Sequence, residues 1–336
     1  MKRTALFVVL AYLAVPGTVL GQAAVVELQQ SGGASTDESS GSSTQLRVFG
    51  EPVRRLRFKI EGSLGKQWGE ESDLLGTAYP YEGNVELIEA YAEYLFPERS
   101  FVRSVRGGRY RTPFGISSSS EHAYIGFMRP PLIRYGEYWA LSSGYMEHGA
   151  DVVVGTPHLS AEVSVGRPAD VGEAIRRPGV DTVFRAEGSS DSFIVGYSFI
   201  NTMPYEPSEW AFAPARFNGV DVRWMQGGVE LRGEYLRGQS AESTFTDGAY
   251  VDVIAHRPAM GPVTILGRAE WLDYDVFPET PEWELHTKRF QAGLRVRVWQ
   301  GLSVSAGVSH QRDMVTQYRP TALDVGFSYS VRTPHP

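Results

Sequence analysis

The sequence contains no cysteine, which excludes disulfide bonds and thiolate metal ligands. It also lacks a basic excess, since 32 Lys and Arg face 39 Asp and Glu and the net charge is −7. Binding to nucleic acid depends on a positive surface that neutralises phosphates, so no nucleic-acid partner is expected. Beyond the N-terminus, no window of about 20 residues is uncharged, and no helix is expected to cross a membrane.

Motifs that carry chemistry are also missing. The seven histidines show no H-E-x-x-H spacing, and no Gly-Lys-Ser/Thr follows Gly107 and Gly108 as a phosphate loop would require. No G-x-S-x-G elbow marks a nucleophilic serine. The sequence therefore predicts no enzyme, no metal and no cofactor.

The N-terminus has the pattern of an export signal. Lys2 and Arg3 precede an apolar run from Ala5 to Val15, and a stretch of small residues ends at Ala23. The run is too short to cross about 30 Å of hydrocarbon. Residues 1–23 are therefore predicted to be a cleaved signal peptide.

Residues 24–50 are rich in Ser, Gly and Gln and poor in apolar residues. This composition predicts a flexible segment without regular structure.

From about residue 54 onward the pattern changes. Apolar residues such as Leu56, Phe58 and Ile60 alternate with Arg57 and Lys59, and the same alternation returns in many later segments. A period of two predicts β-strands with one apolar and one polar face.

Segments of this kind are joined by connections that alternate between long and short. A single-chain transmembrane barrel has this pattern, with an even number of antiparallel strands. We therefore predict an all-β chain with a transmembrane antiparallel β-barrel over residues 51–331, of about 14 strands, with about 12 or about 16 as alternatives. Residues 332–336 form a short C-terminal tail. In the segment 101–106, neither assignment of alternate residues to the two faces of a strand fits well, because Arg106 would face lipid. A β-bulge is therefore expected there.

A soluble β-sandwich would also alternate. Two features favour the barrel. Aromatic residues such as Trp224, Trp299 and Tyr235 stand near predicted strand ends on the apolar face, where interfacial girdles belong. The last strand carries Gly326, Tyr329 and Val331 in an order that resembles the C-terminal assembly signal of outer-membrane barrels, followed by five further residues.

Several stretches resemble a known family. The segment 89–94 reads Glu-Ala-Tyr-Ala-Glu-Tyr, the segment 108–115 reads Gly-Arg-Tyr-Arg-Thr-Pro-Phe-Gly, and the segment 219–224 reads Gly-Val-Asp-Val-Arg-Trp. They resemble the phosphate-selective porin O and P family of outer-membrane porins. The resemblance implies a solute-conducting barrel in the outer membrane, usually trimeric, with a preference for anions.

Candidate channel residues follow from strand parity. If Tyr110 faces outward, Arg109 and Arg111 face the lumen. The connection 113–146 is too long to be a mere turn. It is expected either to fold into the barrel, bringing Arg129 and Arg134 to a constriction with Arg109 and Arg111, or to form an extracellular cap. Further basic residues expected to line the lumen are Arg57, Lys59, Arg223, Arg232, Arg295 and Arg297. About as many acidic residues alternate with them, so the average charge of the wall predicts little ion preference.

Together these observations predict a water-filled porin for passive diffusion of small hydrophilic solutes, with at most a mild preference for anions such as phosphate. Its expected partners are those solutes or anions, outer-membrane lipids, the barrel assembly machinery and two further copies in a homotrimer. Residues 24–50 would then lie in the periplasm. The alternative is a structural or adhesive barrel with an occluded lumen.

Overall fold

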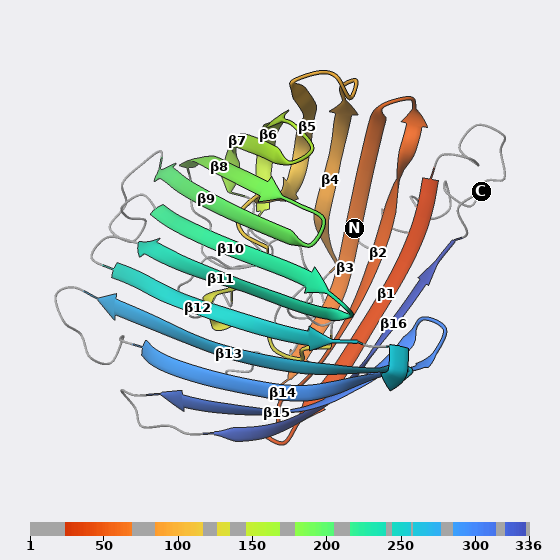
Figure 1. Cartoon of the computed structure of the whole chain (residues 1–336), viewed down its shortest axis with the longest axis vertical. Helices are drawn as coiled ribbons and strands as arrows, with labels where there is room; N and C mark the ends of the chain where they lie inside the picture. The colour runs from red at the N-terminus through yellow and green to blue at the C-terminus, as the bar shows by residue number, and fades with distance from the viewer. Residues whose placement is uncertain are drawn as a thin grey trace.

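The computed structural model describes residues 24–68, 85–116, 126–134, 146–168, 179–204, 216–239, 244–256, 258–276, 285–313 and 320–333. Most of these residues lie in 16 antiparallel strands that form one closed barrel (Figure 1). Each strand pairs with its neighbours in sequence, and β1 pairs with β16 to close the wall. Among the described residues, no helix is long and apolar enough to cross a membrane.

The strands are β1 (Ala24–Ser35), β2 (Ser40–Val53), β3 (Leu56–Trp68), β4 (Val85–Leu95), β5 (Val102–Arg111), β6 (Met146–Gly155), β7 (Leu159–Pro168), β8 (Gly179–Ser189), β9 (Phe193–Pro204), β10 (Arg216–Gln226), β11 (Val229–Gln239), β12 (Thr244–Ala255), β13 (Val263–Val276), β14 (Leu285–Trp299), β15 (Leu302–Asp313) and β16 (Thr321–Arg332). Two 3-10 turns, η2 (Leu132–Arg134) and η4 (Pro258–Met260), complete the described secondary structure.

The two ends of the barrel differ in their connections. At one end, here called the short-turn end, hairpins close tightly. Gly227 and Gly228 join β10 to β11 with φ angles of 59° and 79°, and two positive φ values suit the right-handed twist of a two-residue hairpin. The start of β1 and the end of β16 meet at this end, where the Thr333 amide donates to the Val26 carbonyl. Most of the longer connections lie at the other end, called the long-connection end.

The barrel wall has an apolar outer face and a polar inner face. Ile60, Val220 and Leu294 are exposed on the outside, whereas Glu61 and Asp221, their neighbours in sequence, are buried inside. This follows from the period-two alternation, because successive side chains of a strand point to opposite faces. Such a wall suits a barrel whose outside meets lipid and whose inside is polar.

The structure corrects the expectation of a flexible segment at residues 24–50. These residues form β1 and most of β2, so the barrel runs from Ala24 to Arg332 and has the 16 strands of the alternative count. The low apolar content is tolerated because only one face of each strand needs to be apolar. Polar residues such as Gln29 and Gln45 are buried on the inner face, while Leu28 is exposed outside.

Candidate pore and the segment inside it

The described residues of the connection after β5, 112–116 and 126–134, lie inside the barrel, as one of the two sequence interpretations expected. Phe114 is fully buried, and the Gly115 amide donates to the Ser198 hydroxyl on β9 at 3.1 Å. Residues 126–134, called the inner segment below, also contact the barrel wall from within. They lie among inward-facing residues of β12, β13, β14 and β16, so they narrow the lumen on that part of the wall.

Apolar packing holds the connection on one part of the wall. Phe114, Leu132 and Ile133 form a buried cluster with inward-facing apolar side chains of six strands. Those wall residues are Val183, Ile200, Phe217, Leu236, Tyr250 and Leu272. Burial of each such side chain contributes about 1.5–3 kcal/mol. The cluster therefore fixes the connection without any covalent link.

Charged hydrogen bonds hold the inner segment at its other contacts. The guanidinium of Arg129 donates to both carboxylate oxygens of Asp324 at 2.9 Å and to Asp37 at 2.6 Å. Arg268 donates to the Arg129 carbonyl at 2.8 Å, and the Leu132 amide donates to Glu270 at 2.7 Å. These bonds satisfy the backbone of a segment that has left the wall, as buried polar groups require.

Two glycines of neighbouring strands make room for the inner segment. Gly33 of β1 and Gly326 of β16 are cross-strand partners. A Cβ atom at Gly33 would lie 2.3 Å from the Met128 methyl carbon, and one at Gly326 would lie 2.2 Å from it. Gly326, expected as part of an assembly signal, thus has a structural role of its own. Val331 of the same expected signal is exposed on the outer face, and Tyr329 is half-buried.

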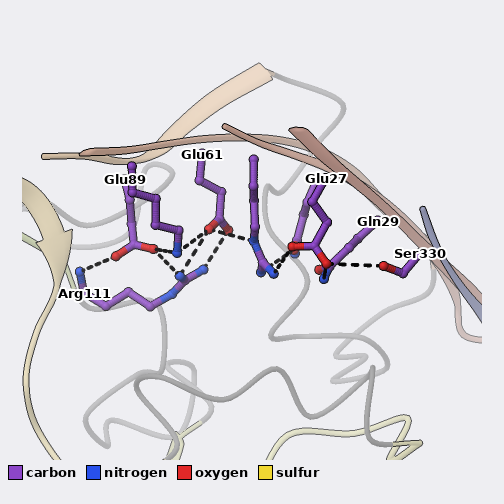
Figure 2. A network of polar contacts seen from close by, with 9 residues as sticks. Glu27, Gln29, Glu61, Glu89, Arg111 and Ser330 are labelled. Carbon is purple, nitrogen blue, oxygen red and sulfur yellow. Dashed lines mark hydrogen bonds and ion pairs between the residues drawn. The ribbon is translucent and has the colours of Figure 1, made fainter. Parts of the chain in front are cut away.

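A ladder of ion pairs runs along the inner face of β1–β5 (Figure 2). It comprises Glu27, Arg47, Glu61, Lys59, Glu89 and Arg111. Arg111 donates to Glu61 at 2.8 Å and also pairs with Glu89. Three basic and three acidic groups alternate, so the ladder adds little net charge to this side of the lumen.

Arg106 faces the lumen, and the bulge expected near it is present. The register of β5 on β6 shifts between Val102 and Ser104, which turns Arg106 inward. Its guanidinium pairs with Asp151 and with Glu162 at 2.9 Å and lies over the Tyr110 ring at 4.3 Å. Sequence reasoning placed the bulge but left Arg106 out of the channel residues.

Inward-facing cations are more exposed near the short-turn end. The side chains of Arg57 and Arg223 are 55% and 39% exposed, and Arg297 is also exposed. Their cross-strand partners Glu93, Arg232 and Ser303 place all three on the inner face. We call Arg57, Arg223 and Arg297 the basic mouth. Arg57 is 4.0 Å from Glu51 and Arg223 is 2.7 Å from Glu230, so their charges are partly compensated.

The expectation that Arg109 faces the lumen is wrong. Tyr110 is the inward residue, fully buried with its hydroxyl 2.7 Å from that of Ser164. Arg109 lies on the outer face beside His148. Arg111 has the same parity but enters the lumen, because the chain leaves the wall directly after it.

The predicted cluster of arginines at one constriction is also corrected. Arg129 pairs with residues of β16 and the β1–β2 turn, whereas Arg111 pairs with β3 and β4. Arg232 is buried against Asp252 at 3.0 Å, and Arg295 lies near Ser328 at 3.5 Å. The side chain of Arg134 lies outside the described residues. Within the part of the chain that the structure describes, no three His, Asp or Glu residues are grouped as a metal site.

Comparison with known proteins shows a likeness of fold alone. No family model matches the sequence, and no curated protein matches it. The solved structure of OprB from Pseudomonas putida is similar with a TM-score of 0.67, at 8% identity over 96% of this chain and 97% of that one. An anion-selective porin from Comamonas acidovorans is similar with a TM-score of 0.61, at 10% identity over 92% of this chain and 98% of that one. The trimer form of OmpT, an outer membrane protein of Vibrio cholerae, has a TM-score of 0.58 at 8% identity, over 92% of this chain and 98% of that one.

Proposed function

We propose that this chain is an outer-membrane porin that conducts small hydrophilic solutes by passive diffusion. The observation that carries the proposal is a closed barrel of 16 strands with a charged inner face and an apolar outer face. Barrels of about 16 strands are wide enough to leave an aqueous channel. The structures of similar fold come from outer-membrane porins, which supports the same location for this chain, with the long connections outside the cell.

The proposed channel has a mild preference for anions such as phosphate, set at the basic mouth. Along the ladder and around Arg106, cations are matched by carboxylates at short distance. The basic mouth is more exposed, and charges that line a pore at close quarters act on passing ions. Because Arg109, Arg111 and Arg129 do not meet, we propose no dedicated phosphate filter.

Export, assembly and oligomerisation complete the proposal. Residues 1–23 would be removed as a signal peptide, and the expected tail would be shortened to residues 333–336, because Arg332 belongs to β16. Gly326, Tyr329 and Val331 would be read by the barrel assembly machinery. A homotrimer in outer-membrane lipid is proposed by analogy with the trimer form of a structure of similar fold. Chemical crosslinking of the protein in native membranes, followed by mass measurement, tests the trimer.

Single-channel recording tests the conduction. Refolded protein added to a planar bilayer in KCl should give discrete conductance steps. A heat-modifiable shift in gel migration should show in the same sample that the barrel is folded. A folded barrel that leaves the bilayer silent at all voltages would contradict the porin and favour a structural barrel with an occluded lumen.

A further inference from the structure

Three basic residues form a row on the outside of the barrel. Arg109 of β5 is the cross-strand partner of His148 of β6, and His148 is the partner of Arg167 of β7. His148 and Arg167 are exposed, and Arg109 is half-buried. Directly opposed side chains lie about 5 Å apart at their Cβ atoms. The register therefore builds one continuous basic row across three strands.

The row borders a shallow, open hollow. Arg109 donates from Nε to the Ile88 carbonyl at 3.0 Å and from Nη1 to His148 Nε2 at 2.9 Å. A guanidinium only donates, so Nε2 accepts, and Nδ1 of the neutral ring carries the proton. Leu87, Gly108, Arg109, His148 and Gly149 line the hollow. The guanidinium is thus held in a defined orientation on the outer face.

Glycine maintains the close strand approach beside this hollow. Gly108 has a φ of +134°, and a Cβ there would lie 2.3 Å from the Ala90 carbonyl oxygen. A Cβ at Gly149 would lie 2.3 Å from the Val165 carbonyl oxygen. Side chains are therefore excluded from these two positions by the backbone of β4 and β7.

The charge and the height of the row point to its ligand. Among the described residues, the outward faces of β4–β8 carry no carboxylate. On the short-turn side the row adjoins exposed apolar residues, Val105, Val152 and Val165. On β5, β6 and β7 it therefore lies at the end of the apolar face toward the long connections, whereas on β4 the exposed Leu87 and Val85 continue that face beyond Ala90, the partner of Arg109. At that height a membrane presents lipid headgroups, and juxtamembrane arginines attract anionic ones.

We propose that Arg109, His148 and Arg167 bind the phosphate of an outer-leaflet lipid headgroup. Arginine suits this ligand, since its planar fork pairs with two phosphate oxygens, and the Nδ1–H of His148 adds a third donor. The inference goes beyond conduction and requires only that the barrel lies in the outer membrane with the long connections outside.

A second copy of the chain fits the row less well. The outward carboxylates Asp247, Asp273 and Asp275 lie on β12 and β13, on the far side of the barrel (Figure 1). A closed threefold ring joins surfaces that are about 60° apart on each subunit. These carboxylates are too far around the wall to meet the row in such a trimer.

Binding of diphosphorylated lipid A to the full-length barrel in a neutral detergent tests the proposal. Dephosphorylated lipid A and inorganic phosphate serve as comparison probes, and mass spectrometry measures the lipid retained after gel filtration. Wild type should retain the phosphorylated lipid more tightly than the dephosphorylated one. Replacing both arginines, Arg109→Gln with Arg167→Gln, should weaken binding of the phosphorylated lipid by about fivefold per arginine, or ~25-fold together.

Matched controls separate the row from general surface charge and from misfolding. Arg216→Gln with Arg237→Gln removes two cations from β10 and β11 at the same end of the barrel, where Arg216 bonds to Asn201 and Arg237 faces Asp247. This pair should leave lipid retention unchanged. Arg167→Lys keeps the charge but loses the planar fork, so its binding should lie between that of wild type and that of Arg167→Gln, which changes only an exposed residue and should show about a fivefold loss.

Three results would overturn the inference. Equal retention by wild type and the Arg109/Arg167 variant is the first. The second is wild-type binding of inorganic phosphate with no preference for the phosphorylated lipid. The third is loss of trimers in the variant with unchanged lipid retention, which would assign the row to a contact between copies. Conductance recorded on the same samples keeps the two proposals apart, since a silent barrel with intact lipid binding contradicts only the porin.

Discussion

At the scale of single residues, the inner wall is governed by arginines that act as structural crosslinks. Arg268 has no exposed side-chain surface and donates to both oxygens of Asp252, which is equally buried. It also stacks over Phe127 at 4.1 Å and bonds to the backbone of the inner segment. A buried pair of this kind contributes mainly through the cost of breaking it, because the remaining charge is left in a low dielectric.

Arg268→Met should destabilise the folded barrel by about 1–3 kcal/mol, because it removes charged hydrogen bonds while Asp252 keeps its pairing with Arg232. The methionine leaves Asp252 with Arg232 at 3.0 Å and removes the bond to the Arg129 carbonyl. The urea midpoint of reversible folding into lipid vesicles measures the change. Arg297→Met, at an exposed position, is the control and should stay within about 0.5 kcal/mol of wild type. Equal midpoints for the two variants would show that Arg268 is no crosslink.

The basic mouth gives a second prediction at the residue scale. Replacing Arg57, Arg223 and Arg297 together with Gln should shift the zero-current potential toward cation preference across a KCl gradient. The shift should be larger at about 0.1 M than at about 1 M salt, because the screening length falls from about 10 Å to about 3 Å. Arg109→Gln is the matched control, since its side chain is outside the lumen. A shift in the control alone would contradict the assignment of both faces.

At the scale of elements, the connection between β5 and β6 shows how one segment changes environment along its length. As β5 ends at Arg111, the chain leaves the wall and Phe114 enters the lumen. The inner segment is then held on two sides, by the apolar cluster and by Arg129. A segment held in this way keeps a fixed position in the pore.

One of these anchors is sensitive to strongly acidic conditions. Partial burial alone would raise the pKa of Asp37, but hydrogen bonds from Ser39 and the charge of Arg129 outweigh it and lower that pKa to about 2. The depressed value means that the ionised pair with Arg129 stabilises the fold above the unfolded pKa of about 3.9. That contribution is lost as the pH falls from about 4 through 2.

Single-channel current noise should therefore rise in wild type between about pH 4 and pH 2, as the inner segment loosens. Asp37→Asn should show the higher noise already at pH 6 and a smaller change on acidification. The difference between the two proteins is the measurement, because other carboxylates titrate in both. Identical pH profiles would show that Asp37 does not hold the segment.

At the scale of the whole molecule, closure depends on the first two strands. β1 pairs with β16 on one side and with β2 on the other. Without them, β3 and β16 would expose unpaired backbone groups to lipid, each costing several kcal/mol.

Deletion of residues 24–53 should thus prevent formation of a heat-modifiable barrel, as measured by gel migration and by circular dichroism. Deletion of residues 334–336, beyond the last strand, is the control and should leave folding unchanged. A folded, conducting product of the 24–53 deletion would contradict closure through β1.

Much of the architecture was accessible from the sequence because it depends on local patterns. Alternation in segments such as 56–61 fixes which residues face lipid, and the spacing of turns fixes the hairpins. β1 and β2 were missed because their polar composition mimics a flexible linker, although Val26 and Leu28 do alternate with Glu27 and Gln29. Apolar residues at inward positions, such as Phe217 and Leu236, could have been noticed in the sequence, because they stand where polar residues are expected. They mark the part of the wall on which Phe114, Leu132 and Ile133 pack.

The sequence by itself determined the all-β wall, its two faces and the inward position of Arg57, Arg223 and Arg297. Only the tertiary structure decided which residue each charged side chain contacts and which residues of β5 face the lumen. A bulge resets parity, so Arg106 turns inward and Arg109 outward. Salt bridges such as Arg129 to Asp324 join residues almost two hundred positions apart. Strand alternation acts over two residues, whereas these contacts exist only once the barrel has closed.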